Sequence, residues 1–172
     1  MKRCVFFDRY GVVNEAPGPG YVERWSDLHV LPDFVHAARV ALDRGYGCAV
    51  VTNQRGVARG IMSVETLQDI HRRLEDALSA RGVPLLGIYA CTHNPGECTC
   101  RKPQPGLLLR AAREHNVDLA ASWMVGDQAR DIEAGQRAGC RTIFVTTDEG
   151  GAGADYSVPS VAGLVPLFGR VL

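Results

Sequence analysis

The sequence is short of the features that mark several classes of protein. Among its 172 residues lysine occurs only twice, aromatic residues make up 7%, and 19 basic side chains balance 19 acidic ones. A neutral chain with scattered arginine has no overall attraction to nucleic acid. The first ten residues contain no long apolar run and no cleavage signal, and no later segment approaches the length of a membrane span. We therefore expect neither a nucleic acid nor a membrane as a partner.

Known phosphate-binding sequences are also missing. The glycine-rich segment 148–153 contains neither a Walker sequence nor a dinucleotide fingerprint, so it is predicted to be a flexible surface loop. We find no internal repeat and no domain linker. With 46% hydrophobic residues the chain can bury one core, and we expect a single domain over residues 1–172 that works as a monomer.

Six cysteines could indicate disulfide bonds, but no export signal accompanies them. A reducing cytoplasm is therefore the expected location. Three of the six, Cys4, Cys48 and Cys140, lie at or near the start of apolar runs. We expect them to be small buried hydrophobic side chains.

The other three cysteines belong to a compact pattern in the loop 91–102. Cys91, His93, Cys98 and Cys100 form a Cys-x-His pair and a Cys-x-Cys pair, separated by four residues that include an Asn-Pro-Gly turn. Three sulfurs and one nitrogen are a ligand set that tetrahedral structural Zn²⁺ accepts. A site with four protein ligands has no open position, so the metal would hold the loop and take no part in catalysis. The alternative is three buried thiols beside an ordinary surface histidine.

Apolar runs alternate with helical patterns along the chain. The predicted strands span 3–8, 46–52, 85–92, 123–127 and 141–147, and the predicted helices span 33–44, 64–81, 106–115 and 128–138, with a short final helix within 156–172. Continuous apolar strands separated by helices predict an α/β fold, a Rossmann-like parallel sheet with helices on both faces. Ligands in such folds bind beyond the carboxyl ends of the strands.

Polar side chains occur where four of these strands end. Asp8 follows the first strand, and a carboxylate there can attack phosphorus to form an aspartyl-phosphate. Thr52 and Asn53 offer a hydroxyl and backbone N–H groups to phosphoryl oxygens. Lys102 follows the cysteine loop, in a chain that otherwise uses arginine, and supplies a compact positive charge.

Two more carboxylates follow the fourth strand. Asp127 and Asp131 are four residues apart at a helix start and therefore share one face of the helix. That spacing suits one Mg²⁺ ligand and one carboxylate in the outer coordination sphere. An aspartate after a strand is usually only a turn residue or helix cap. The order of nucleophile, hydroxyl, lysine and paired acids, each after its own strand, favours a phosphate site.

Four segments carry a resemblance to a known family. FFDRYGVVN at 6–14, VTNQRGVARG at 51–60, CRKPQPG at 100–106 and VGDQARD at 125–131 closely resemble the haloacid dehalogenase (HAD) superfamily, in particular its histidinol-phosphatase-related group. The similarity extends to about residue 147. It implies a HAD-type phosphatase fold with a small cap made of loops, dependence on Mg²⁺, and removal of the C7 phosphate of D-glycero-D-manno-heptose 1,7-bisphosphate during synthesis of the heptose used in lipopolysaccharide.

The resemblance also implies roles for single residues. Asp8 would be the nucleophile, and Asp8, Asp127 and the main-chain carbonyl of Tyr10 would hold Mg²⁺, with Asp131 behind them. Thr52 and Lys102 would grip the transferred phosphoryl group. The flap 14–22 would face a phosphorylated sugar, and the matched substrate-binding residues are Gly20, Tyr21, Asn53, Gln54, Arg55 and Arg101. Arg55 stands where many relatives carry serine.

Tyr10 departs from the family pattern. The first motif of the family reads Asp-x-Asp, and its second aspartate gives a proton to the leaving alkoxide and later takes one from water. A phenol, with a pKa of about 10, can donate a proton but is not a ready base at neutral pH. Losing such a group typically costs about 10²–10⁴ in rate. Alternatively, Tyr10 only packs in the flap while Glu15, Asp131 or His29 transfers the proton.

Two other functions stay open at this point. The chain could be a phosphosugar-binding relative that lost turnover at Tyr10, or a phosphatase of histidinol phosphate or another small phosphomonoester. Pocket shape decides substrate specificity, and these motifs do not describe it. A phosphotransferase is disfavoured because the short loops suggest no large cap to exclude water.

Overall fold

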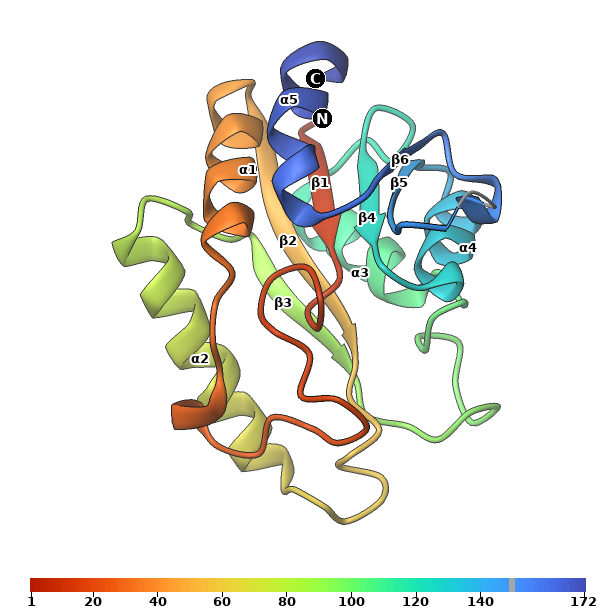
Figure 1. Cartoon of the computed structure of the whole chain (residues 1–172). Coiled ribbons are helices and arrows are strands. Elements are labelled where there is room, and N and C mark those ends of the chain that lie inside the picture. The colour runs from red at the N-terminus through yellow and green to blue at the C-terminus, as the bar shows by residue number, and fades with distance from the viewer. Residues whose placement is uncertain (149–150) are drawn as a thin grey trace.

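The computed structural model, which describes residues 1–148 and 151–172, contains one parallel sheet (Figure 1). Its strands are β1 (Arg3–Phe7), β2 (Tyr46–Asn53), β3 (Gly87–Cys91), β4 (Trp123–Gly126), β5 (Arg141–Val145) and β6 (Tyr156–Val158). The strand order is β3-β2-β1-β4-β5-β6, and every neighbouring pair is parallel. The five predicted strands are present. β6 is an addition, formed by a segment that we expected to contain only a short helix.

Four helices connect the strands and a fifth follows β6, and the four connecting helices match the predicted ranges to within one residue at each end. The five helices are α1 (Pro32–Asp43), α2 (Val64–Ala80), α3 (Gly106–His115), α4 (Ala129–Ala138) and α5 (Leu164–Val171). Ser63 caps α2, because its Oγ accepts a hydrogen bond from the Thr66 N–H at 3.0 Å. α5 is the short final helix expected in the tail. Among the described residues, no helix combines the length and the apolar character needed to cross a membrane.

The predicted surface loop at 148–153 lies partly outside the described residues, which exclude 149 and 150. Its last part, Gly151–Gly153, forms a short 3-10 helix. Two further 3-10 turns lie at Trp25–Asp27 and Val161–Gly163. No ligand-binding role follows from this segment.

The sheet buries apolar side chains on both faces. In β1, Val5 and Phe7 pack with residues of α1, α2 and α5, while Cys4 and Phe6 pack on the opposite face with residues of α3 and α4 (Figure 1). This alternation follows from the two-residue period of a strand. Cys48 and Cys140 are also buried, so the prediction for the three isolated cysteines is confirmed. Helices on both faces leave the strand ends as the surface where polar side chains collect.

The strand order places a topological switch point between β1 and β4. From β1 the chain continues to β2 and β3 on one side, and β4, β5 and β6 lie on the other. Neighbouring crossovers therefore diverge there, which leaves a crevice at the carboxyl ends of β1 and β4. Asp8 directly follows β1, and Asp127 directly follows β4. The two carboxylates consequently meet at that crevice.

A buried cation fixes the turn that follows β1. Arg9 is fully buried, and its guanidinium donates hydrogen bonds to Asn14 Oδ1 at 3.2 Å and to His71 Nε2 at 2.9 Å. The backbone N–H groups of Val13 and Asn14 both donate to the Arg9 carbonyl. Burial and the Arg9 charge lower the pKa of His71 to about 3, so this imidazole is neutral and accepts the bond. The network ties the loop after Asp8 to α2.

We expect this network to make the protein sensitive to acid. His71 titrates at about 6.5 in an unfolded chain, and its folded pKa lies below that. Stability is therefore complete above pH 6.5 and falls as the pH drops towards 3, by about 1.4 kcal/mol per unit. Urea unfolding at pH 7.5 and pH 5 should show that His71→Gln loses about 2 kcal/mol less than the wild type between these values. His29→Gln, at an exposed position, serves as the control; equal losses in all three proteins would contradict the assignment.

Candidate active site

A cavity of about 170 Å³ opens at the switch point. It is lined by residues from the ends of β1, β2 and β4, from the flap and from the loop after β3: Asp8, Tyr10, Ala16, Pro17, Gly18, Thr52, Asn53, Lys102, Asp127, Gln128 and Arg130. The structure thus brings together the predicted nucleophile, hydroxyl, lysine and first acid of the Asp127–Asp131 pair. Sequence separations of more than 90 residues are closed by the parallel pairing of the strands.

Lys102 is the centre of the polar contacts. Its Nζ donates to Asp8 Oδ1 at 2.6 Å and to the Val51 carbonyl at 2.8 Å, and it lies 2.8 Å from Asp131 Oδ1. Burial alone would lower the pKa of this ammonium, but the charges of Asp131 and Asp8 outweigh burial and raise the pKa. Lys102 is therefore a permanent cation whose side chain is almost fully buried.

Asn53 holds the backbone of Lys102 in place. Its Nδ2 donates to the Lys102 carbonyl at 3.0 Å, and the Lys102 N–H donates to its Oδ1, also at 3.0 Å. From the sequence we expected Asn53 to offer its backbone N–H to phosphate. Its side chain, in contrast, bonds to the Lys102 backbone and so ties the end of β2 to the loop that carries this lysine.

The three aspartates form a candidate cation site. One oxygen from each of Asp8, Asp127 and Asp131 lies within 4.8 Å of the others. Asp127 Oδ1 is buried and has no hydrogen-bond partner among the described residues. Burial, followed by the charge of Asp131, raises the pKa of Asp127. An orphaned carboxylate oxygen beside a second carboxylate is what a hard cation such as Mg²⁺ would satisfy, so the residues fit that ion.

The Tyr10 side chain reaches the flap. Its hydroxyl accepts a hydrogen bond from the Val22 N–H at 2.9 Å and donates to Gln54 Oε1 at 3.5 Å. Gln54 Nε2 in turn donates to Thr52 Oγ1 at 3.0 Å. Gln54 is fully buried and does not line this cavity, and its side chain links Thr52 to Tyr10.

Three other residues were considered as proton-transfer groups, and the structure places them outside the cavity. Glu15 and His29 are exposed and do not line it. Asp131 is fully buried, with one oxygen against Lys102 and the other accepting the Gln128 N–H at 3.1 Å in the capping box of α4. Tyr10 and Asp127 are therefore the titratable side chains that line the cavity beside Asp8 and the basic Lys102 and Arg130.

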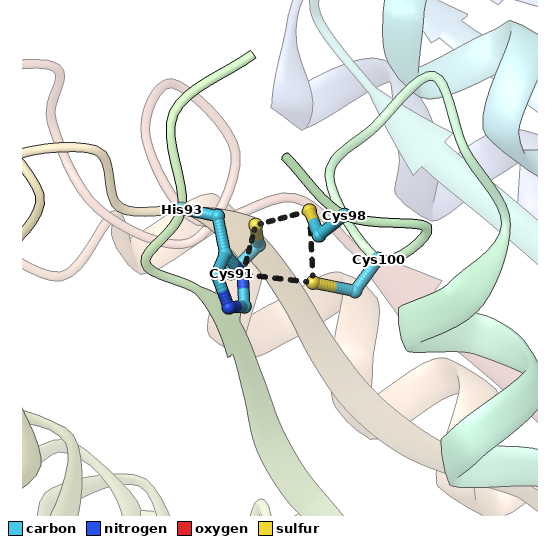
Figure 2. A group of neighbouring side chains, drawn as sticks. All are labelled: Cys91, His93, Cys98 and Cys100. Carbon is cyan, nitrogen blue, oxygen red and sulfur yellow. Dashed lines mark hydrogen bonds between the residues drawn. The ribbon is translucent and has the colours of Figure 1, made fainter. Parts of the chain in front are cut away.

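The four predicted metal ligands converge after β3 (Figure 2). Cys91 Sγ lies 3.5 Å from His93 Nδ1 and 3.6 Å from Cys98 Sγ, and Cys100 Sγ lies 3.4 Å from each of the same two atoms. A tetrahedron with metal–ligand bonds of about 2.0–2.3 Å has edges of roughly 3.5 Å. The donor set and its spacing therefore fit a four-coordinate ion.

The Cys98 thiol has a lowered pKa, unlike the thiols of Cys91 and Cys100. Burial alone would raise the pKa of Cys98, but hydrogen bonds from the Cys100 thiol and from backbone N–H groups outweigh burial and lower the pKa to about 7. Burial, followed by hydrogen bonds to the other two thiols, raises the pKa of Cys100 to about 12. A cation would be needed to hold the remaining thiols as thiolates.

A second pocket of about 260 Å³ adjoins the first. It is lined by Tyr10, Gly18, Pro19, Gly20, Tyr21, Asn53, Arg55, Arg101 and Arg130. Gly20, Tyr21, Arg55 and Arg101, which were predicted to bind substrate, thus gather here and not around Asp8. In the flap 14–22, residues 16–21 line the two pockets, while Asn14 and Val22 are buried and anchor its ends.

Comparisons with known proteins give a consistent result. Residues 99–162 match the HAD-hydrolase-like family. The chain is 38% identical to D-glycero-beta-D-manno-heptose-1,7-bisphosphate 7-phosphatase of Yersinia pestis, over 94% of this chain and 92% of that protein, and 37% identical to the Pasteurella multocida enzyme of the same name, over 98% and 97%. The chain belongs to the HAD-like phosphatases.

A solved structure of this family has the same fold. D,D-heptose 1,7-bisphosphate phosphatase from B. bronchiseptica, complexed with magnesium and phosphate, superposes with a TM-score of 0.86 at 31% identity, over the full length of both chains. The resemblance to the HAD superfamily, which was inferred from four short segments, is therefore confirmed over the full length of the chain.

Sequence reasoning missed several residues of this HAD-like phosphatase. Arg130 lines both pockets but was read only as a position between Asp127 and Asp131. Arg9 and His71 were not identified either, although they fix the loop after Asp8. A cue for Arg130 was available, since a residue in the first turn of a helix that follows a strand end points towards the ligand edge of the sheet. No cue joined Arg9 to His71 across 62 positions.

Replacing Gly11 is predicted to be costly because its backbone conformation and its close neighbour both disfavour a side chain. Its φ is +81°, and a Cβ at this position would lie 2.2 Å from Asp127 Oδ2. Gly18 has a similar φ of +77°, but a Cβ there would have no neighbouring atom within 4 Å, so it is a matched control. We expect Gly18→Ala to cost about 1 kcal/mol in unfolding free energy and Gly11→Ala to cost about 3 kcal/mol. Urea unfolding measures both free energies. Equal losses in the two variants would show that the Asp127 side chain moves away from the new Cβ at no cost in stability.

Proposed function

We propose that this HAD-like protein removes the C7 phosphate of D-glycero-D-manno-heptose 1,7-bisphosphate through an aspartyl-phosphate on Asp8, with Mg²⁺ as cofactor. The observation that carries the proposal is the Lys102 ammonium 2.6 Å from Asp8 in a cavity at the switch point. The relatives named for that reaction support the substrate. The whole chain, 1–172, would act as one phosphatase domain.

Asp8 is the proposed nucleophile because it combines exposure to the cavity with a fixed orientation. It follows β1 directly, and its backbone N–H donates to the Val125 carbonyl at 2.9 Å, which holds it to β4. A carboxylate oxygen of Asp8 would attack phosphorus, and the bond from phosphorus to the sugar oxygen would break. Water would then attack the same phosphorus, releasing phosphate and regenerating the Asp8 carboxylate.

Lys102 and Thr52 would bind the transferred phosphoryl group. The ammonium is charged and buried, so its attraction for a phosphoryl oxygen is weakly screened. Thr52 Oγ1 already accepts a bond from Gln54, which leaves the hydroxyl proton free to be donated to phosphate. Both side chains would stabilise the negative charge on the phosphoryl oxygens throughout the reaction.

Asp8, Asp127 and the main-chain carbonyl of Tyr10 would hold Mg²⁺, and Asp131 would hold Lys102 beside them. When bound, Mg²⁺ supplies positive charge that reduces the repulsion between a carboxylate and a phosphate ester. The magnesium and phosphate in the B. bronchiseptica relative support this assignment. The orphaned oxygen of Asp127 supports it independently.

Tyr10 is the proposed proton donor to the leaving sugar oxygen. Its hydroxyl borders the cavity, and its hydrogen bond to Gln54 is long at 3.5 Å, so the proton is weakly engaged. The Arg9 guanidinium lies 4.8 Å from the centre of its ring. A phenol remains a poorer acid than a carboxyl group, so we expect a slow enzyme.

Cys91, His93, Cys98 and Cys100 would hold one structural Zn²⁺. The spacing of their sulfur and nitrogen atoms supports a tetrahedral ion with four protein ligands. All six cysteines are free, which supports a reducing cytoplasm as the location. We also propose that the protein acts as a monomer.

Phosphate release from heptose 1,7-bisphosphate tests the function. We expect turnover by the wild type that requires added Mg²⁺ and disappears in Asp8→Asn, which keeps the shape of the side chain but removes the nucleophile. Tyr10→Asp should raise the rate by about 10²-fold. Tyr10→Phe keeps the ring but has no proton to donate, so it should be slower than the wild type.

Three outcomes would contradict parts of this proposal. Phosphate release that persists in Asp8→Asn would contradict the aspartyl-phosphate intermediate. Phosphate release that persists without any divalent cation would contradict the need for Mg²⁺. Equal rates for the wild type and Tyr10→Phe would mean that the phenol transfers no proton and serves only to hold Val22.

Metal analysis tests the cysteine cluster. We expect one equivalent of zinc in the purified protein, and less than about a tenth of that in Cys98→Ser, because a tetrahedral site loses most of its affinity with one ligand. The melting temperature of Cys98→Ser should fall by about 2–4 °C for each kcal/mol lost. Cys140→Ser lies outside the cluster and should keep its zinc; zinc retained in both variants would refute the ligand assignment.

A further inference from the structure

Arg9 is a buried cation whose hydrogen-bond partners are neutral. It is fully buried and directly follows Asp8, yet it forms no ion pair with a carboxylate in the part of the chain that the structure describes. Its Nε and Nη1 donate to Asn14 and His71, while its Nη2 has no hydrogen-bond partner there. Burying a charge without an opposite charge destabilises a fold. Stability alone therefore gives no reason for an arginine at this position.

The backbone of Arg9 organises the turn that carries Tyr10. The Arg9 carbonyl accepts hydrogen bonds from the N–H groups of Val13 at 2.9 Å and Asn14 at 3.1 Å. The Gly11 N–H donates to the Asn14 carbonyl at 2.8 Å. The Asn14 side chain closes the turn a second time, because its Oδ1 accepts from Arg9 Nε at 3.2 Å. The conformation of residue 10 thus depends on both the main chain and the side chain of Arg9.

His71 fixes the Arg9 side chain from α2. Its Nε2 accepts a hydrogen bond from Arg9 Nη1 at 2.9 Å. Its helix neighbours Ile70 and Leu74 are buried in the core, so the packing of α2 sets the position of the imidazole. The guanidinium also lies 4.8 Å from the centre of the Tyr10 ring, within the range of a cation–π contact. Direct contacts therefore lead from His71 through Arg9 to Tyr10, although His71 does not line the cavity.

We propose that His71 is a positioning residue for the reaction: by holding the Arg9 guanidinium, it sets the conformation of Tyr10. The inference rests on the proposed function, in which the Tyr10 carbonyl holds Mg²⁺ and the Tyr10 hydroxyl donates a proton. Both atoms belong to one residue, so a shift of the turn displaces both of them from the reacting groups. A displacement of about 1 Å can lower a rate by about 10². Binding of the sugar should change little, because neither Arg9 nor His71 lines the cavity.

The test compares two amides in place of His71. In His71→Gln the side-chain oxygen reaches the place of Nε2 and can accept the hydrogen bond from Arg9. In His71→Asn the side chain is shorter, so its oxygen takes the place of Nδ1 and stops short of Arg9. Both side chains are polar and uncharged, so the two variants differ in that one contact. Leu78→Val is the control for a loss of stability, because Leu78 is fully buried in the same helix and has no polar group in its side chain.

Two measurements are made on each protein. The first gives kcat and KM for phosphate release from heptose 1,7-bisphosphate. The second gives the exchange rate of the Val22 N–H with solvent, followed by NMR without substrate or Mg²⁺, because this N–H donates to the Tyr10 hydroxyl at 2.9 Å. We expect His71→Asn to lower kcat about tenfold, to keep KM within about twofold, and to speed Val22 exchange about tenfold. His71→Gln and Leu78→Val should resemble the wild type in both measurements.

Three results would overturn the proposal. They are an unchanged kcat in folded His71→Asn, an equal loss of kcat in His71→Gln, and an equal loss in Leu78→Val. A circular dichroism melting curve shows whether each variant is folded at the assay temperature. If His71→Asn does not fold, His71→Ser takes its place, because the short serine hydroxyl also stops short of Arg9.

The two measurements separate failure of this inference from failure of the proposed function. If the wild type releases phosphate and His71→Asn does so at the same rate, the phosphatase assignment stands and the role of His71 is wrong. If the wild type releases no phosphate but Val22 exchange is faster in His71→Asn and unchanged in His71→Gln, His71 positions Tyr10 and the proposed reaction is wrong.

Discussion

The site depends on one buried ammonium among three buried or half-buried carboxylates. Lys102 Nζ contacts Asp8 and Asp131 at 2.6 and 2.8 Å, and Asp127 lies within 4.8 Å of both aspartates. Removing such charges from water costs several kcal/mol for each ion, and one cation does not neutralise three anions. A cluster with this imbalance contributes little to folding on its own. It is better understood as a structure prepared for another cation and for a phosphate.

The surroundings of Lys102 show how the fold supports that imbalance. Asn53 clamps its backbone from both sides, and the Val51 carbonyl takes a third contact from its ammonium. Arg9, directly after Asp8, donates to Asn14 and to a neutral His71 and not to the carboxylate of Asp8. Arg9 and Lys102 thus bond to different side chains, and Lys102 is the cation that pairs with Asp8 among the described residues.

The sequence predicted the framework because its signals are local. Apolar runs and caps defined five strands and four helices, and the rule for parallel sheets put Asp8, Thr52, Lys102 and Asp127 at one edge. The four candidate metal ligands lie within ten positions of each other, so their spacing alone predicted the cluster. Contacts between distant side chains had no such signal. The links from Tyr10 to Val22, from Arg9 to His71 and from Arg55 to Asn94 depend on loop conformations that only the folded chain defines.

The switch point also has a consequence for how the chain folds. β1 and β4 pair through Val5 with Trp123 and their neighbours, so two segments about 118 positions apart must meet before the crevice exists. Closing so long a stretch of chain costs conformational entropy and slows folding. A nascent chain that has emerged only as far as α3 contains Asp8 and Lys102 but not yet Asp127 and Asp131. The cluster of Asp8, Lys102, Asp127 and Asp131 is therefore complete only once β4 has joined β1, and it is lost when that central pairing opens.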